Sequence, residues 1–165
     1  MCGILIYHKS HLDYLDNIDK FIKHRGPDKF NKIEIDDYIF THSLLSINSN
    51  KFDKIQPVQK QEFTILFNGE IYNVEELKEK YDLPREFIDT DILIPLHKIL
   101  GINFIYEIKG MFAIVIYNSK KKEFVLVRDE FGIKPLFYSK INQKIIISSE
   151  IKPIKFLKNK KKSSL

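Results

Sequence analysis

The chain reads MFAIVIYNSKKKEFVLVRDEFGIKPLFYSKINQKIIIS over residues 111–148, and this stretch gives the clearest indication of its fold. Runs of β-branched and aromatic residues predict four successive strands, at 111–117, 123–128, 136–139 and 145–148. The residues between the runs have turn chemistry: Asn118-Ser119, Phe131-Gly132 and Asn142-Gln143. The C-terminal half of the chain is therefore predicted to be built mainly from strands.

The pattern continues on the N-terminal side, where helices alternate with further strands. We predict strands at 4–7, 33–35, 38–47 and 63–67, and helices at 12–24, at 74–81 and from Asp89 or Thr90 to about Leu100. Gly26-Pro27-Asp28 should end the first helix, Asn68-Gly69 should close the strand 63–67, and Pro95 should kink the last helix or shift its start. Strands at both ends with helices between them predict a layered α+β domain with two sheets.

Composition places the 165 residues among globular proteins, with 44% hydrophobic and 30% charged residues. The longest apolar run, residues 111–117, is too short for a membrane-spanning helix, which needs roughly 20 residues. No cationic stretch precedes the apolar residues 2–7, so they do not resemble a secretory signal. A single cysteine cannot form an internal disulfide, and the expected location is cytoplasmic. One Cys and five scattered His show no metal-ligand spacing, so neither metal nor cofactor is expected.

The net charge of +5 comes from the C-terminal end of the chain. Six lysines follow Ile151 without any acid, which leaves residues 1–150 with a net charge of −1. A nucleic-acid-binding domain would carry its basic surface on the folded body. Nucleic-acid and membrane partners are therefore not expected, and the lysine-rich end is interpreted as a solvated terminus.

Cys2 directly follows the initiator methionine. If Met1 is removed, Cys2 carries a free α-amine beside its thiol, and that amine can serve as the local base for a nucleophilic sulfur. Cysteine is also a common buried residue on a first strand. A pairing of Cys2 with one of the histidines is a further alternative, although no spacing singles one out. Position alone leaves these readings open.

Eight motifs follow one another in register along nearly the whole chain. They are Met1–Ile4 (MCGI), His24–Asp28 (HRGPD), His42–Ile47 (HSLLSI), Asn68–Asn73 (NGEIYN), Thr90-Asp91, Lys109–Ile114 (KGMFAI), Arg128–Tyr138 (RDEFGIKPLFY) and Ser148–Lys152 (SSEIK). Together they resemble the N-terminal glutaminase domain of glutamine-dependent asparagine synthetases, which are class II glutamine amidotransferases. The resemblance implies a four-layer α/β/β/α sandwich of the N-terminal-nucleophile hydrolase type in residues 1–156. Residues 157–165 are expected to form a basic, disordered tail.

The resemblance also implies a mechanism. Cys2 would attack the side-chain carboxamide of glutamine, release ammonia and leave a glutamyl thioester, which water hydrolyses to glutamate. The side-chain amide of Asn68 and the backbone N–H of Gly69 would form the oxyanion hole, and losing one such donor typically costs about 10²–10³-fold in turnover. Without the resemblance, Asn68-Gly69 would be interpreted as a plain β-turn.

Substrate binding follows from the same resemblance. Asp91 would pair with the α-ammonium group of glutamine and could also stabilise the N-terminus of its helix. Arg25, Asp28 and the 128–138 motif are expected to be architectural. The complete predicted substrate-binding set is Leu44, Leu45, Ser46, Ile47, Asn48, Asn68, Gly69, Glu70 and Asp91.

Leu44 departs from the family pattern His-x-Arg-Leu-Ser-Ile, in which the Arg binds the α-carboxylate of glutamine. Losing this charge-assisted pair is expected to weaken binding about 10- to 100-fold. A nearby cation, Lys51, Lys54 or Arg85, could replace it. Alternatively, the domain binds glutamine poorly, uses another amide, or is an impaired or inactive binding or regulatory module of the same fold.

The asparagine synthetases continue into a larger domain that activates aspartate with ATP. Residues 1–165 contain neither its Ser-Gly-Gly pyrophosphate loop nor a Walker-type phosphate loop. We therefore expect glutamine as the small-molecule substrate and a separate synthetase chain as the partner that takes up ammonia. A truncated synthetase is the alternative.

Overall fold

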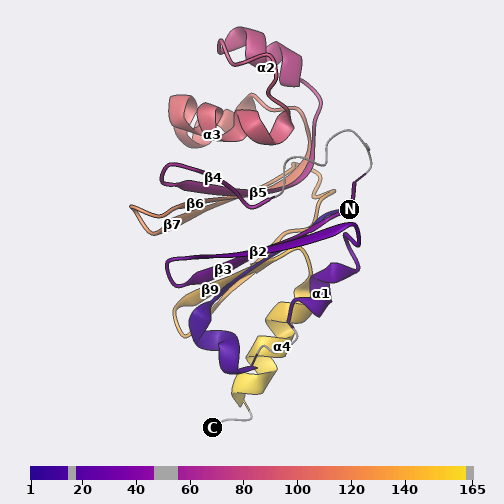
Figure 1. The fold of residues 1–165 in the computed structure, drawn as a ribbon, viewed down its shortest axis with the longest axis vertical. Coiled ribbons are helices and arrows are strands. Elements are labelled where there is room, and N and C mark those ends of the chain that lie inside the picture. The colour runs from indigo at the N-terminus through magenta and orange to yellow at the C-terminus, as the bar shows by residue number, and fades with distance from the viewer. Residues whose placement is uncertain (15–17, 47–55, 163–165) are drawn as a thin grey trace. The chain divides into compact units, whose positions relative to one another are not determined.

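The computed structural model describes residues 1–14, 18–46 and 56–162, and the chain divides into two compact units. The first unit comprises residues 1–58 and 135–165, and the second comprises residues 59–134. Each unit consists of one sheet and its own helices (Figure 1). The single domain 1–156 that the motifs imply, with its boundary, remains a prediction.

The sheet of the first unit has five strands in the order β2-β3-β1-β9-β8, and each neighbouring pair is antiparallel. The strand nearest the N-terminus therefore lies in the middle of the sheet, between β3 and β9. The elements of this unit are β1 (Gly3–His8), the 3₁₀ helix η1 (Lys9–Tyr14), α1 (Lys20–Lys23), β2 (Lys29–Ile35), β3 (Tyr38–Leu44), β8 (Phe137–Ile141), β9 (Lys144–Ser148) and α4 (Ile151–Lys162).

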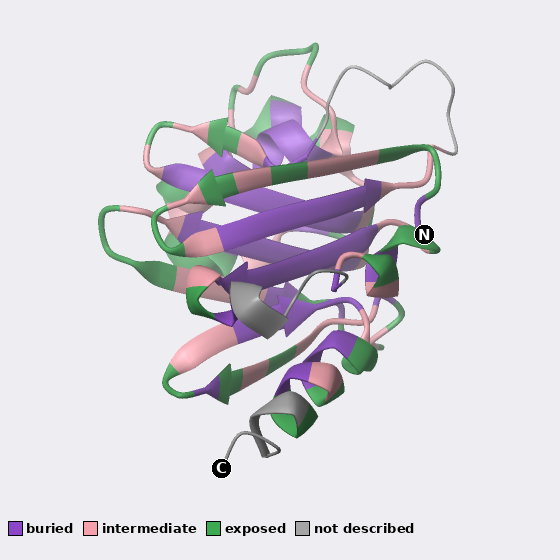
Figure 2. Cartoon of the chain, turned by 60° about the horizontal axis from the view of Figure 1, so that its bottom comes forward, coloured by how far each residue is buried: buried purple, intermediate pink, exposed green. Residues whose placement is uncertain are grey.

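Side chains alternate between the two faces of this sheet, as they must in extended strands. Leu5 and Tyr7 of β1 face α1 and α4, and we call this the helix face. The core cluster on it comprises Leu5, Tyr7, Ile18, Ile22, Ile39, Ile141, Ile146, Ile154 and Leu157. Ile4 and Ile6 point to the opposite face and are also fully buried. Figure 2 shows the central strands buried along most of their length, whereas the edge strand β2 carries exposed residues.

The second unit has a four-stranded sheet in the order β4-β5-β6-β7. The helix α3 packs against β5 and buries Ile92, Leu93 and Leu96. The elements of this unit are β4 (Val58–Lys60), which begins one residue before the unit boundary, β5 (Phe63–Ile71), α2 (Val74–Lys80), α3 (Asp89–Leu100), the 3₁₀ helix η3 (Gly101–Tyr106), β6 (Gly110–Asn118) and β7 (Glu123–Arg128). Among helices of the described ranges, none has the length and apolar composition needed to cross a bilayer.

Most predicted strands are present within one or two residues of their expected bounds, but the helix predicted at 12–24 is wrong in extent. The structure has a 3₁₀ helix at 9–14 and one helical turn at 20–23. Ile18 and Ile22 are buried as their spacing predicts. The buried side chains of Ile18 and Ile22 stabilise only the single helical turn next to them, because a short helix depends on tertiary packing for its stability.

Two further expectations differ from the structure. The strand β5 continues through Asn68-Gly69 to Ile71, because both residues pair with β6. The helix α4 extends to Lys162, so residues 157–162 of the expected tail are helical, because Ile154 and Leu157 join the core cluster. The helix α3 begins where predicted and contains Pro95 in its interior.

Candidate active site

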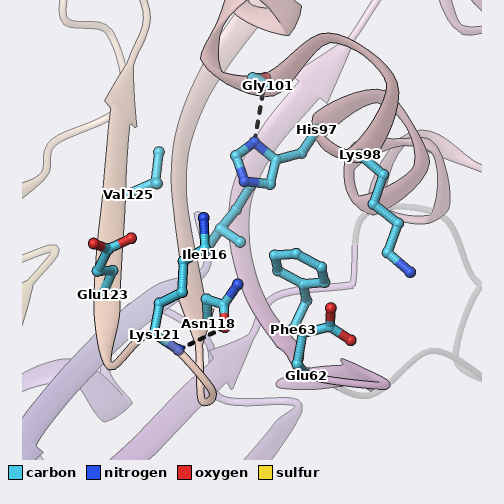
Figure 3. Close-up of a pocket in the computed structure, with 10 residues that line it drawn as sticks. All are labelled: Glu62, Phe63, His97, Lys98, Gly101, Ile116, Asn118, Lys121, Glu123 and Val125. Atoms are coloured by element: carbon cyan, nitrogen blue, oxygen red, sulfur yellow. Dashed lines mark hydrogen bonds between the residues drawn. The ribbon is translucent and has the colours of Figure 1, made fainter.

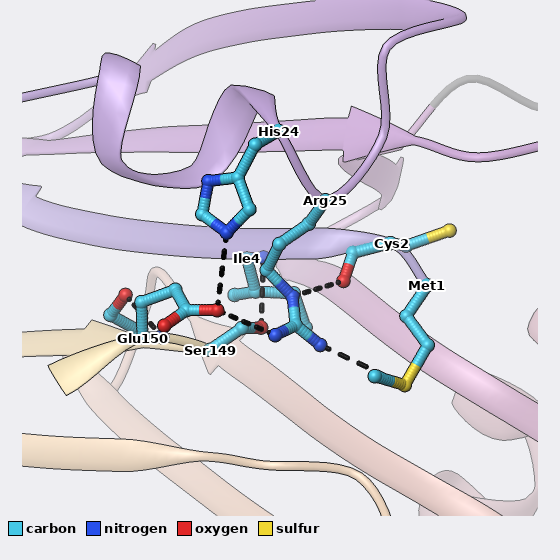
Figure 4. Close-up of polar contacts among 8 residues, drawn as sticks. Met1, Cys2, Ile4, His24, Arg25, Ser149 and Glu150 are labelled. Carbon is cyan, nitrogen blue, oxygen red and sulfur yellow. Dashed lines mark hydrogen bonds and ion pairs between the residues drawn. The ribbon is translucent and has the colours of Figure 1, made fainter.

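Cys2 directly precedes β1 and is held through its main chain. Its carbonyl oxygen accepts a hydrogen bond of 3.1 Å from Nε of Arg25. The Arg25 side chain is 8% exposed, and its Nη1 lies 2.7 Å from Oε1 of Glu150. Figure 4 shows the thiol directed away from this guanidinium group. The contacts with Arg25 thus fix the backbone of Cys2 without engaging its sulfur.

Among the residues that the structure describes, the sulfur makes one long polar contact. Sγ of Cys2 lies 3.8 Å from the carbonyl oxygen of Leu45, just beyond the end of β3. The residue is half-buried and its thiol is free of any disulfide. A fixed backbone together with a thiol that forms no short hydrogen bond within the described ranges is an arrangement suited to a nucleophile.

The HRGPD loop that carries Arg25 also holds the end of β3. Gly26 packs so tightly on the backbone of Ser43 and Leu44 that a Cβ has no room there. The N–H of Asp28 donates to the carbonyl of Leu44 at 3.1 Å. The Asp28 carboxylate accepts from the N–H of Ser46 at 2.7 Å. One loop therefore positions both Cys2 and the segment 44–46.

The SSEIK motif supports the start of β1 from its other side. Ser149 is 1% exposed, and its Oγ accepts from the N–H of Ile4 at 3.0 Å. Its own N–H donates to the carbonyl of Ile4 at 2.8 Å. The next residue, Glu150, is the partner of Arg25 (Figure 4). Three motifs far apart in the sequence thus meet around Cys2 in the first unit.

Asn68 lies within β5 in the second unit, opposite Ala113 of β6, and is 2% exposed. Its side-chain Nδ2 is buried and lacks a hydrogen-bond partner within the described ranges. A buried donor without a partner costs about 1–3 kcal/mol. An oxygen atom of a ligand would satisfy it, so Asn68 is a candidate donor to a bound substrate.

Gly69 lies opposite Phe112, and the two strands approach closely there. A Cβ on Gly69 would lie 2.7 Å from Cα of Phe112, so any side chain would force the strands apart. The strand β4 has three residues and β5 has nine, so β4 covers only part of the edge of β5. Backbone N–H groups alternate between the two edges of a strand. One of the N–H groups of Asn68 and Gly69 therefore points to the edge away from β6.

The other predicted binding residues are distributed as follows. Glu70 is exposed, and Asp91 is 6% exposed in the first turn of α3. The carboxylate of Asp91 accepts a hydrogen bond of 3.0 Å from the N–H of Ile88, which stabilises the N-terminus of α3. In the first unit, the carbonyl oxygen of Leu45 contacts the sulfur of Cys2, and Leu44 and Ser46 flank Leu45 in the chain. The predicted residues Ile47 and Asn48, and the candidate cations Lys51 and Lys54, lie outside the described residues, while Arg85 is exposed in the second unit.

The Arg128–Tyr138 motif forms a tight turn built around Asp129. The carboxylate of Asp129 is 5% exposed and accepts N–H groups from Ile133 at 2.7 Å, Lys134 at 2.9 Å and Phe112 at 3.2 Å. Burial raises the pKa of Asp129, but the hydrogen bonds from these three N–H groups outweigh burial and hold it below its ordinary value. Arg128 donates to carbonyls of the same turn.

A cavity of about 570 Å³ lies elsewhere in the second unit, near His97, Phe63 and the ends of β6 and β7 (Figure 3). None of the predicted site residues lines it, so it lends no support to the candidate site. In the part of the chain that the structure describes, no three His, Cys, Asp or Glu side chains are grouped to bind a metal ion.

A model of the glutamine amidotransferase domain matches residues 1–164. The chain belongs to this family. The resemblance inferred from the sequence motifs is thereby confirmed.

Three relatives within this family are glutamine-hydrolysing asparagine synthetases by name. Asparagine synthetase 2 of Bacillus subtilis is 37% identical over 138 residues, which cover 81% of this chain and 18% of that protein. Putative asparagine synthetase 2 of Methanocaldococcus jannaschii is 33% identical over 198 residues, which cover 99% of this chain and 37% of that protein. Asparagine synthetase B of Escherichia coli is 32% identical over 144 residues, which cover 83% of this chain and 26% of that protein. The amidotransferase domain thus spans well under half the length of these relatives.

Solved structures establish the fold of the amidotransferase domain. Glutamine phosphoribosylpyrophosphate amidotransferase of Bacillus subtilis matches with a TM-score of 0.75 at 16% identity, over 95% of this chain and 43% of that one. A structure described as the allosteric regulatory enzyme of purine biosynthesis matches with a TM-score of 0.76 at the same identity and coverage. The expected fold class, an α+β sandwich of the N-terminal-nucleophile hydrolase type, is confirmed.

Proposed function

We propose that this chain hydrolyses the side-chain amide of glutamine, with Cys2 as the nucleophile, and produces glutamate and ammonia. The observation that carries the proposal is the way Cys2 is held. Arg25 fixes its main chain, while among the described residues the sulfur has a single polar contact, at 3.8 Å from the carbonyl oxygen of Leu45. Membership of the glutamine amidotransferase family supports the choice of substrate.

Removal of Met1 is the first requirement, because its peptide bond occupies the amine of Cys2. Met1 is 48% exposed, and its sulfur lies 3.9 Å from Nη2 of Arg25, so its loss breaks no short contact there. An α-amine titrates near pH ~8 in model peptides. Part of it is therefore unprotonated at neutral pH and can accept the thiol proton.

The reaction then follows in two stages. The sulfur attacks Cδ of glutamine, and the carbonyl electron pair moves to oxygen. The Nδ2 group of Asn68, buried without a partner in the described residues, and the N–H of Gly69 would donate to that oxyanion. The intermediate collapses as the α-ammonium of Cys2 protonates the departing nitrogen, which leaves as ammonia. Water then attacks the thioester while the amine accepts its proton. The C–S bond breaks, the ammonium returns the proton to the sulfur, and glutamate is released.

Substrate recognition in this proposal begins with the α-ammonium group of glutamine. The carboxylate of Asp91 would bind the α-ammonium of glutamine, as the family resemblance implies. The exposed Glu70 would assist it. The segment from Leu44 to Asn48, through Leu45, Ser46 and Ile47, would flank the substrate beside Cys2.

The ammonia would serve an amide transfer carried out by a synthetase active site outside residues 1–165. The names of the relatives support this destination, since they join glutamine hydrolysis to asparagine synthesis. The synthetase site, its acceptor and its docking surface are all part of the proposal.

The test is the intact mass of the purified chain before and after treatment with 6-diazo-5-oxo-norleucine, followed by ammonia release from glutamine. We expect loss of the Met1 mass, one adduct, and no adduct on a Cys2→Ala variant. A processed chain that remains unlabelled and releases no ammonia would contradict the proposal and favour a non-catalytic binding module. If Met1 is retained, its removal in vitro with an aminopeptidase precedes the same two measurements.

A further inference from the structure

The strand register places three residues in one row across the sheet of the first unit. Gly3 of β1 pairs with Ser43 of β3, and Ser43 pairs with Phe30 of β2. The next row toward the end of the sheet therefore contains Cys2, Leu44 and Lys29. The pair of Leu44 and Lys29 is a direct ladder pair. Cys2 directly precedes β1, and its sulfur contacts the carbonyl oxygen of Leu45, the residue after Leu44, at 3.8 Å.

The side chains of Cys2, Leu44 and Lys29 share the face opposite to the helices. Phe30 packs against the core cluster of the helix face, and its ring lies 5.0 Å from the ammonium of Lys23 in α1. Because neighbours along a strand alternate, Lys29 must point to the opposite face. A Cβ on Gly3 would lie 3.2 Å from Cβ of Ile22, so position 3 faces α1 and Cys2 faces away from it.

We propose that Lys29 binds the α-carboxylate of the substrate and is a specificity-determining residue of this site. This inference rests on the proposed hydrolysis of glutamine and adds a residue to it. A glutamine molecule carries a carboxylate at the end remote from the scissile amide. That group needs a cation near the nucleophile, and Leu44, Leu45 and Ser46 provide none.

The dimensions of the row fit the substrate. Lys29 and Cys2 lie two strand spacings apart, about 10 Å between their Cα atoms at ~4.8 Å per strand. Four carbon–carbon bonds separate the amide carbon of glutamine from its carboxylate carbon, a distance of ~5 Å in an extended chain. A lysine side chain reaches ~6 Å from its own Cα. The ammonium of Lys29 therefore needs to shift only a few ångströms toward Cys2 to reach the carboxylate of a bound glutamine.

The other two members of the row suit the same substrate. Leu44 lies between the sulfur and the ammonium, where its methyl groups would contact the two methylene groups of glutamine. Lys29 is exposed and forms no ion pair or hydrogen bond with any residue that the structure describes. Its charge is therefore available to a ligand.

The chain offers a matched control on the same face. Lys140 of β8 pairs with Ile145 and is exposed, as Lys29 is. The β1–β9 register places Lys140 in the same row across the sheet as His8. His8 is six residues along the chain from Cys2, a distance of about 20 Å at ~3.3 Å per residue. Lys140 matches Lys29 in chemistry and exposure but is too distant to reach the same substrate.

The experiment measures how well a ligand protects Cys2 of the processed chain from alkylation by iodoacetamide. The ligands are L-glutamine and 4-aminobutanamide, which lacks the α-carboxylate. For Lys29→Ala we expect the half-protecting concentration of glutamine to rise about 10- to 100-fold, and that of 4-aminobutanamide to stay within threefold. Lys29→Arg should restore protection by glutamine, and Lys140→Ala should behave as the wild type. Melting temperatures of the variants verify folding.

The outcomes separate this inference from the proposed function. If glutamine protects the wild type and Lys29→Ala equally, or if both ligands lose affinity equally in the variant, the role of Lys29 is refuted while the hydrolytic function stands. If glutamine neither protects the wild type nor releases ammonia, the proposed function fails and the role of Lys29 fails with it.

Discussion

Replacing Arg25 by methionine is the sharpest test of how Cys2 is positioned. The change removes the hydrogen bond of 3.1 Å to the Cys2 carbonyl and the contact of 2.7 Å with Glu150, and it keeps most of the aliphatic volume. The side chains of Arg25 and Glu150 are only 8% and 22% exposed, so solvent compensates poorly for their separation. Removing one partner of a buried ion pair costs about 3–5 kcal/mol.

We therefore expect the free energy of unfolding to fall by about 3 kcal/mol, the lower end of that range, because Glu150 keeps a contact of 3.5 Å with His24. For a chain of this size, the melting temperature should fall by about 6–12 °C. Arg25→Lys keeps the charge, but one ammonium cannot reach both acceptors, so about half of the loss should remain. The assay is urea unfolding followed by circular dichroism.

Activity provides the second measurement. With the Cys2 backbone less constrained, Arg25→Lys should reduce kcat about 10- to 100-fold with a smaller change in KM, because misplacement by about 1 Å can cost 10²-fold. The control is His24→Ala, since His24 is 59% exposed and touches the same Glu150 at 3.5 Å. That variant should change stability by less than about 0.5 kcal/mol. Wild-type stability in Arg25→Met, or full turnover in Arg25→Lys, would refute the reasoning.

Three further substitutions test other parts of the structure. Asn68→Ala should lower turnover about 10²–10³-fold, yet change the free energy of unfolding by less than about 1 kcal/mol, because it removes a buried donor without a partner in the described residues; a parallel loss of both would argue for a structural role. Gly69→Ala should destabilise the protein by about 1–3 kcal/mol through its approach to Phe112, measured by urea unfolding; an unchanged midpoint would contradict the close strand contact. Asp129→Asn should cost about 1–3 kcal/mol for each N–H left without an acceptor. Because the pKa of Asp129 is lowered in the folded state, its stabilisation is present above the ordinary carboxyl pKa of ~3.9 and is lost as pH falls through the folded value. The gap between wild type and variant should therefore narrow below pH ~4, and a gap that widens in acid would refute this assignment.

The local patterns of the sequence determined the strands of the C-terminal half well. The runs at 111–117 and 123–128 correspond to β6 and β7, which pair as neighbours, and the positive φ angles of Asn142 and Gln143 form the turn between β8 and β9. These elements were predictable because β-branched runs and turn residues act over a few positions. The proposal that Cys2 is a nucleophile could likewise be made from the sequence, since it depends on chain position and residue type.

The local patterns were wrong where a distant partner overrides propensity. Asn68-Gly69 has the composition of a turn, yet pairing with Ala113 and Phe112 keeps both residues extended within β5. Lysine-rich residues 157–162 are helical because Leu157 reaches a core assembled from strands more than ten residues away in sequence. Neither partner can be identified from the segment itself.

The sequence by itself determined the strand pattern, the motif order and, through these, the family. Only the tertiary structure decided that Arg25 binds the backbone carbonyl of Cys2 and is itself held by Glu150, 125 residues away in sequence. The same holds for Lys29, whose row with Leu44 and Cys2 exists only because β1 and β2 both pair with β3. Secondary-structure propensity acts between neighbours in sequence, whereas strand register depends on the hydrogen bonds of whole ladders. A register shift of one residue would turn the side chain of Lys29 to the other face of the sheet.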